Sequence, residues 1–94
     1  MKNYEGMFII RPDLSQQEAD KVASGIEELI LKFEGKIKDS SIWGKRQLAY
    51  EVGGHREGSY RLIRFEIGSD QIDKLKGNYG HNENILKYLI TKIK

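Results

Sequence analysis

Hydrophobic residues recur along the chain with two different periods, one of which predicts strands and the other helices. Residues 4–10 end in a continuous apolar run before Pro12, as expected of a central strand that is buried on both sides. From Ser15 the spacing changes to three and four residues, which is typical of a helix with one apolar face. That face is predicted to contain Ala19, Val22, Ala23, Ile26, Ile30 and Phe33. Ser15 with Glu18 fits a capping box at the start of the helix, and Gly35 is expected to end it in the left-handed conformation.

Residues 36–52 predict a second strand of unusual length. Its inward-facing positions change from odd numbers, as at Ile37, to even numbers at Leu48, Tyr50 and Val52. A bulge or kink near Trp43 and Gly44 would reconcile the two halves, because one extra residue reverses the alternation of side chains. A flexible, glycine-rich hairpin loop is expected over residues 53–58.

The remaining residues predict a strand, a short helix and a final strand. Residues 59–67 alternate, and one face is predicted to contain Arg61, Ile63, Phe65 and Ile67. Ser69 is expected to cap a short helix whose apolar stripe comprises Ile72, Leu75 and Tyr79. After a turn at residues 82–84, residues 85–93 are rich in β-branched side chains, which favours a strand.

The order of these elements is strand, helix, strand, strand, helix, strand. This order predicts the split βαβ plan, which is the ferredoxin-like βαββαβ fold of the α+β class. Two right-handed crossovers would place both helices on one face of a four-stranded antiparallel sheet and leave the other face open. Since no linker, repeat or low-complexity stretch interrupts the sequence, we expect a single domain over residues 1–94.

Composition and charge restrict the chemistry that this fold could carry. The chain has no cysteine, which excludes disulfides and thiolate metal sites. Charged residues make up 32% of the chain and hydrophobic residues 38%, so we expect a folded protein with a heavily solvated surface. No apolar run reaches membrane-spanning length, and the N-terminus lacks the pattern of a signal peptide. We therefore expect a cytoplasmic protein that does not span a membrane.

The net charge of +2 conceals an uneven distribution along the chain. Residues 12–34 carry two cations and six anions, which is a balance of −4. Residues 35–61 have a balance of +3, and residues 74–94 have a balance of +4. A folded chain with this distribution could place a basic face on phosphate groups while an acidic face meets the solvent.

Catalytic, metal and nucleotide sites find little support in the sequence. His55 and His81 are the two histidines, and neither has a partner at the spacing of metal ligands. Glycine-rich phosphate loops and nucleophile motifs are absent. Small enzymes of this fold, such as acylphosphatase, need an anion-cradling loop after the first strand. Here Pro12 and Asp13 follow Arg11, which removes a backbone donor and adds an opposing charge. We expect no catalytic residue, no metal and no cofactor.

The octapeptide from Trp43 to Tyr50, WGKRQLAY, is the most informative motif. It places Lys45 and Arg46 between a Trp-Gly break and an apolar run, so two adjacent cations lie beside a strand kink. Such a pair suits an anionic polymer, because phosphate contact requires positive groups and the guanidinium offers a fork of donors.

With this octapeptide the whole chain resembles the family of bacterial small-subunit ribosomal protein six. Three weaker pieces match in the right order and spacing: Tyr4-Glu5 with the strand that follows, Gly58-Ser59-Tyr60, and residues 82–87. The resemblance implies a ferredoxin-like structural protein of the small ribosomal subunit, without catalytic activity. It further implies binding to the central domain of small-subunit ribosomal RNA together with small-subunit ribosomal protein eighteen.

The resemblance also implies where RNA contacts are expected. The positions that keep a cation here are Lys2, Lys45, Arg46 and Lys87. Two departures concern this expectation, since Gly80 and His81 replace an arginine and an apolar residue that are common in the family. Loss of that arginine would weaken one phosphate contact.

The open face of the predicted sheet favours a protein partner. It is expected to present Met7, Ile9, Tyr60 and Leu62, which together are apolar enough to be covered by another protein. Stacking of bases on this face is disfavoured, because Leu62 occupies a position where an RNA-recognition module carries an aromatic ring. We expect the free protein to be monomeric. The alternative is a regulatory or ligand-binding domain of the same fold that dimerises through its sheet and does not bind RNA.

Overall fold

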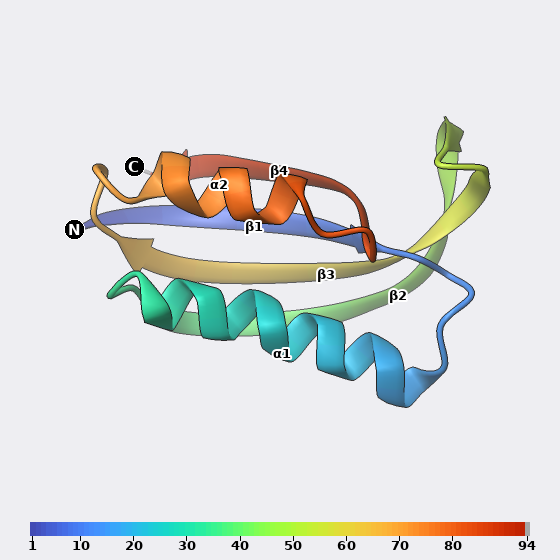
Figure 1. Ribbon diagram of the computed structural model, residues 1–94, viewed down its shortest axis with the longest axis horizontal. Helices are drawn as coiled ribbons and strands as arrows, with labels where there is room; N and C mark the ends of the chain where they lie inside the picture. The colour runs from blue at the N-terminus through green and yellow to red at the C-terminus, as the bar shows by residue number, and fades with distance from the viewer. Residues whose placement is uncertain (94) are drawn as a thin grey trace.

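The computed structural model describes residues 1–93 and has the predicted order of elements. The elements are β1 (Lys2–Ile10), α1 (Gln16–Lys32), β2 (Lys36–Val52), β3 (His55–Ile67), α2 (Ile72–Gly80) and β4 (Ile85–Ile93). The strands form one antiparallel sheet in the order β2-β3-β1-β4, and both helices cover the same face (Figure 1). The predicted ferredoxin-like fold is confirmed, as is the central position of the first strand.

The hydrophobic core lies between the two helices and the sheet. Phe8, Phe65 and Leu75 are fully buried there, and Phe8 meets the ring of Tyr79 edge to face at 4.9 Å. The hydroxyl of Tyr79 donates a hydrogen bond of 2.7 Å to the carbonyl oxygen of Ile26, which ties α2 to α1. Burial raises the pKa of Tyr79 well above its ordinary value, so this hydroxyl remains a donor.

The capping box at the start of α1 is confirmed. The amide of Glu18 donates to Ser15 Oγ at 3.2 Å, and the amide of Ser15 donates to Glu18 Oε1 at 3.1 Å. The predicted end of this helix is wrong, because Glu34 and not Gly35 adopts the left-handed conformation, with φ of 65°. Gly35 is required for another reason. A Cβ atom there would lie only 2.8 Å from the carbonyl oxygen of Glu66.

Two further boundaries differ from the prediction. Ser69 does not cap the second helix, which begins at Ile72 after Gln71 and has no side-chain hydrogen bond at its start. The expected loop over residues 53–58 is shorter in the structure, because β3 already begins at His55. Gly53 and Gly54 form the turn with φ of 56° and 81°, a region that glycine enters without steric cost.

The long strand β2 is interrupted in its pairing with β3 at three places. One lies between Ile42 and Gly44, so the bulge predicted near Trp43 and Gly44 is confirmed. The largest lies between Gln47 and Val52, where five steps along β2 face two steps along β3. These extra residues lift the end of the hairpin out of the sheet (Figure 1). We call residues 47–57 the hairpin arm.

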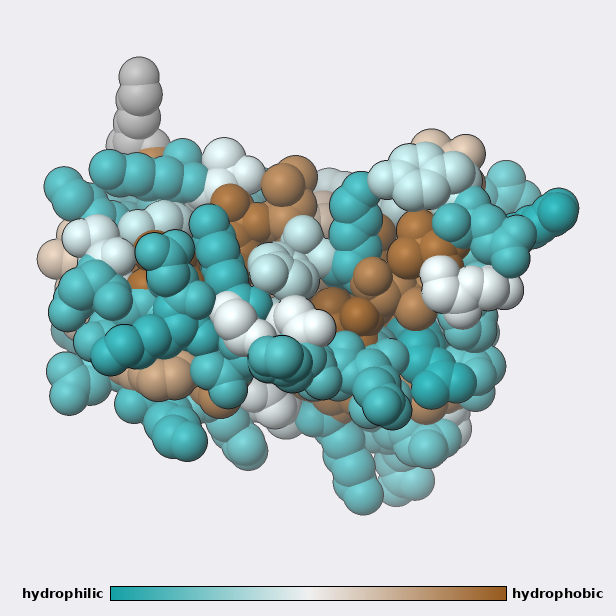
Figure 2. All heavy atoms as spheres, turned by 45° about the horizontal axis from the view of Figure 1, so that its top comes forward, coloured by the Kyte–Doolittle hydropathy of each residue, from teal (hydrophilic) through white to brown (hydrophobic). Residues whose placement is uncertain are grey.

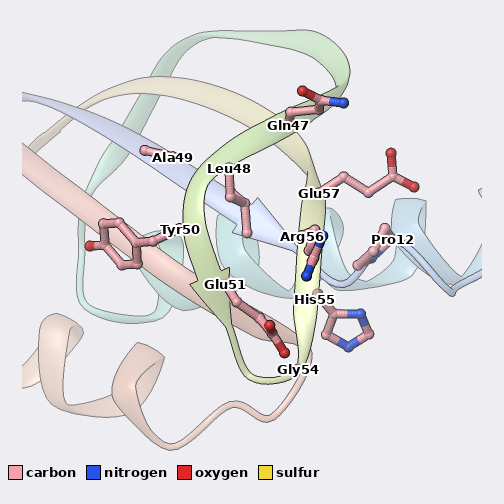
Figure 3. A pocket seen from close by; sticks show the side chains of 10 residues that line it. All are labelled: Pro12, Gln47, Leu48, Ala49, Tyr50, Glu51, Gly54, His55, Arg56 and Glu57. Carbon is pink, nitrogen blue, oxygen red and sulfur yellow. The ribbon is translucent and has the colours of Figure 1, made fainter.

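The hairpin arm overturns one prediction and creates an open hollow. Tyr50, which was expected to face inward with Leu48 and Val52, is 63% exposed. The arm and Pro12 surround a hollow of about 720 Å³ (Figure 3). The side chain of Tyr50 points away from the end where Pro12 and His55 lie and extends toward β4 (Figure 3).

Candidate nucleic-acid interface

Strand register places the predicted partner residues together on the open face. Met7 pairs with Leu62 and Ile9 pairs with Tyr60 across β1 and β3, and these positions alternate with the core residues of β1. Ile9 and Leu62 are nevertheless only 8% and 6% exposed, although no helix covers them. Met7 and Tyr60 are half-buried.

Leu89 extends this apolar surface and was missed from the sequence. It pairs with Met7 across β1 and β4 and is 65% exposed. The two-residue period of the predicted strand over residues 85–93 is the signal that could have found it, because that period places Leu89 on the same face as Lys87. Figure 2 turns the β4 edge of the sheet toward the viewer. In this view hydrophobic side chains form a band between hydrophilic ones, and the band continues to the hairpin arm. We call Met7, Tyr60 and Leu89 the apolar surface.

Lys87 lies beside this apolar surface. It pairs with Ile9 across β1 and β4, and its ammonium group donates a hydrogen bond of 2.8 Å to the hydroxyl of Tyr50. The ammonium group is also 5.2 Å from the centroid of the Tyr50 ring, which is within the range of a cation–π contact. The hydrogen bond raises the pKa of Lys87 and lowers the pKa of Tyr50.

Lys45 and Arg46 are adjacent in sequence but lie on opposite sides of β2. Lys45 lines a hollow of about 270 Å³ together with Gln16 and Ala19 at the start of α1. Arg46 pairs with Gly58, and its guanidinium group is 4.9 Å from the centroid of the Trp43 ring. Alternation along the strand separates the pair. Arg46 is therefore on the side of the open face, and Lys45 is on the side of the helices.

Lys2 is far from the other predicted RNA contacts. It pairs with Ile67 at the beginning of β1, whereas Lys87 pairs with Ile9 near the other end. Seven residues of strand separate these positions, which corresponds to about 23 Å. The structure thus brings Arg46 and Lys87 to one end of the open face, and it places Lys2 at the other end of the molecule.

Gly80 and His81 lie at the end of the sheet where Lys87 is found. Gly80 is the last residue of α2, and His81 follows it on the connection to β4. Both residues are exposed. An arginine at position 80 would therefore add a cation at the same end of the sheet as Lys87, but on the side of the helices.

Several other cations are neutralised by acidic neighbours. Arg61 is only 8% exposed and forms an ion pair of 2.7 Å with Asp20, which fastens α1 to β3. Arg64 on the open face is shared by Glu5 at 3.2 Å and Asp39 at 3.5 Å. Among residues 1–93, none of the ion pairs within 4.0 Å involves Lys45, Arg46 or Lys87. These three exposed cations therefore have no acidic side chain beside them among the described residues.

The described residues contain no cluster of metal-ligating side chains and no helix that could span a membrane. Within residues 1–93, no group of three or more His, Asp or Glu side chains is placed to hold a metal ion. No helix in this part of the chain is long and apolar enough to cross a membrane.

The fold and this surface define a class of protein. It is a small α+β domain whose apolar and basic side chains meet on an open sheet face and not in an enclosed pocket. A model of the family described as Ribosomal protein S6 matches residues 3–92. The chain belongs to the ribosomal protein S6 family, whose members are structural proteins of the small ribosomal subunit and not a family of enzymes.

Individual relatives agree with this assignment. The chain is 36% identical over 90 residues to small ribosomal subunit protein bS6 of Synechococcus sp., covering 96% of this chain and 67% of the relative. It is 34% identical over 93 residues to bS6 of Moorella thermoacetica, covering 99% and 95%. The crystal structure of 30S ribosomal protein S6 from Thermotoga maritima matches with a TM-score of 0.92 and 27% identity over 98% of this chain and 87% of that one.

A more distant structural likeness concerns the fold alone. The C-terminal domain of the MgtC protein from Mycobacterium tuberculosis matches with a TM-score of 0.64 but only 9% sequence identity, over 99% of this chain and 88% of that one. The same arrangement of strands and helices therefore occurs in a domain of very different sequence.

Proposed function

We propose that this small-subunit ribosomal protein binds the central domain of small-subunit ribosomal RNA together with small-subunit ribosomal protein eighteen. The single observation that carries the proposal is the position of Lys87. Lys87 forms none of the ion pairs found among residues 1–93, and it lies opposite Ile9 at the border of the apolar surface. One end of the open face can thus meet phosphate groups and a protein partner at the same time.

Electrostatic attraction supplies the RNA component of this binding. Arg46 on β2 and Lys87 on β4 lie on the side of the open face, at the end of the sheet near the hairpin arm. Lys45 lies at the same end on the side of the helices. Each cation that neutralises a phosphate releases a counterion, so affinity falls as salt concentration rises. The three cations would offer RNA contacts on both sides of the sheet at the end near the hairpin arm. Lys2 would contact RNA only if the bound RNA also reaches the far end of β1.

Burial of the apolar surface supplies the protein component. Leu89 is 65% exposed and stands next to the half-buried Met7. Covering one exposed leucine side chain completely contributes about 1.5–3 kcal/mol. Because the partner would be held on the same RNA, this apolar contact adds affinity that neither protein obtains alone.

The proposed role is structural and involves no reaction. The free protein would be monomeric and would join the ribosome in the cytoplasm. The open face would associate with a second copy only at high concentration, because its apolar part is small. The charged row of Glu5, Arg64 and Asp39 borders that apolar part.

Binding to a central-domain RNA fragment, measured across a salt series with and without protein eighteen, tests the proposal. We expect tight binding only with the partner, and a steep loss of affinity with increasing salt. Arg46→Glu combined with Lys87→Glu should reduce the salt slope by about 2, one for each phosphate contact. Lys21→Glu combined with Lys32→Glu is the matched control, since both lysines are exposed on α1, away from the open face.

Two results would contradict the proposal. If the control pair weakened RNA binding equally, the affinity would depend on net charge and not on the positions of Arg46 and Lys87. Absence of RNA binding, together with a stable dimer in solution, would support a regulatory domain that associates through its sheet.

A further inference from the structure

Tyr50 and Lys87 are in contact although they come from opposite edges of the sheet. The strand order β2-β3-β1-β4 separates β2 from β4 by three strand spacings, which is about 14 Å in a flat sheet. The hairpin arm bridges this distance because its extra residues lift Tyr50 out of the sheet and turn it toward β4 (Figure 3).

A second close approach lies next to this contact. The turn of the arm approaches β4 so closely that a Cβ atom on Gly53 would lie 3.4 Å from Leu86 Cδ2. Leu86 precedes Lys87, so the turn and Tyr50 reach neighbouring residues of the same strand. The turn of the arm therefore lies close to Leu86, and Tyr50 contacts the next residue of the same strand.

The chemistry of the Tyr50 hydroxyl distinguishes it from an ordinary ion-pair partner. A lysine ammonium group has three N–H donors, and the hydroxyl accepts one of them at 2.8 Å. The hydroxyl is neutral, so it restrains the ammonium group without cancelling its charge. Two donors and the full positive charge remain available to a phosphate oxygen. A carboxylate in the same place would restrain Lys87 equally well but would repel the phosphate.

We propose that Tyr50 is a positioning residue for Lys87, holding its ammonium group ready for an RNA phosphate at the border of the apolar surface. This inference rests on the proposed function. A free lysine side chain loses considerable rotamer entropy when a ligand immobilises it. The hydroxyl and ring of Tyr50 restrict Lys87 before binding, so less entropy is lost when the phosphate arrives. The raised pKa of Lys87 agrees with a restrained, fully charged group.

A double-mutant cycle on RNA affinity tests this inference. The full-length protein, Tyr50→Phe, Lys87→Met and the double variant are each titrated with the central-domain RNA fragment in the presence of protein eighteen. Tyr50→Phe keeps the ring and removes only the hydroxyl. We expect it to weaken binding by about three- to tenfold, the cost of immobilising one flexible side chain. In the Lys87→Met background the same change should have no further effect.

Tyr4→Phe is the matched control for loss of a tyrosine hydroxyl. Tyr4 is buried on the helix side of β1, toward the end where Lys2 lies, and its ring stacks on Phe65. We expect RNA affinity to be unchanged in this variant.

A spectroscopic measurement tests whether Tyr50 and Lys87 interact in solution, as the positioning role requires. With ¹³Cζ-labelled tyrosine, NMR titration should show the pKa of Tyr50 below its ordinary value in the unsubstituted protein and returned toward that value in Lys87→Met. A pKa of Tyr50 that does not respond to Lys87→Met would overturn the proposal.

The affinity cycle also distinguishes the two ways of being wrong. If the unsubstituted protein does not bind the RNA fragment, the proposed function itself fails. If it binds and Lys87→Met weakens binding while Tyr50→Phe does not, only the positioning role is overturned. Equal weakening by Tyr50→Phe in both backgrounds overturns it as well, because the hydroxyl then acts independently of Lys87.

Discussion

Two glycines near α1 show how differently single residues can be constrained. Gly25 lies on the exposed side of the helix, and a Cβ atom there would have nothing within 4 Å. Gly35 is buried, and a Cβ atom there would lie 2.7 Å from Ile30 Cγ2 and 2.9 Å from the carbonyl oxygen of Ile30. Backbone atoms cannot move aside as the end of a flexible side chain can, so the two sites should respond in opposite directions.

We predict opposite changes in stability for alanine at these two positions. Gly25→Ala should raise the free energy of unfolding by about 0.5–1 kcal/mol, because glycine in a helix loses more backbone entropy on folding. Gly35→Ala should lower it by about 1–3 kcal/mol through steric overlap. Urea denaturation of both variants checks this, and stabilisation by Gly35→Ala would show that the chain relaxes around position 35.

At the scale of elements, the first turn of α1 contains a carboxylate, Glu18, which stabilises the fold more strongly when it is ionised. The backbone hydrogen bond from Ser15 is the main cause that lowers the pKa of Glu18 below its ordinary value of 4.5. A group whose pKa is lowered by folding stabilises the native state above its unfolded pKa. That stabilisation is lost as the pH falls through the folded pKa.

We predict that Glu18→Gln makes stability less sensitive to acid. Glutamine can accept the same hydrogen bond in a capping box but does not titrate. The urea midpoint of the unsubstituted protein should therefore fall more steeply than that of Glu18→Gln as the pH is lowered from about 6 to 3. Parallel curves for the two proteins would mean that the ionisation of Glu18 contributes nothing to stability.

At the scale of the whole molecule, one end of the open face combines two kinds of surface. Arg46 and Lys87 lie there beside the apolar Met7 and Leu89, while the acidic solvent face of α1 lies on the other side of the sheet. RNA and a protein partner can thus approach the same end without meeting the acidic helix. This arrangement predicts that partner and RNA contacts can be weakened separately.

Leu89→Gln should separate these contacts. Because Leu89 is 65% exposed, we expect the stability of the free protein to change by less than about 0.5 kcal/mol. RNA affinity should fall by about tenfold with protein eighteen present and should be unchanged without it. Equal loss in both conditions would place Leu89 at the RNA and not at the partner.

Local patterns in the sequence determined the order of the elements and much of the core. The three- and four-residue spacing in α1, the capping box at Ser15 and the apolar run of β1 predict features that are confirmed, because each depends on residues that are close along the chain. The bulge near Trp43 and Gly44 could also be predicted, since a change of phase is visible in the sequence itself.

Only the tertiary structure decided how the binding surface is assembled. Strand alternation separates the sequence neighbours Lys45 and Arg46, but the bulge between Ile42 and Gly44 decides which of them lies on the side of the open face. Tyr50 reaches Lys87 only because extra residues curl the hairpin arm across the sheet, and the length of that irregularity depends on pairing with β3. Contacts between distant residues follow from register and curvature, whereas the sequence by itself determined only the period and the order of the elements.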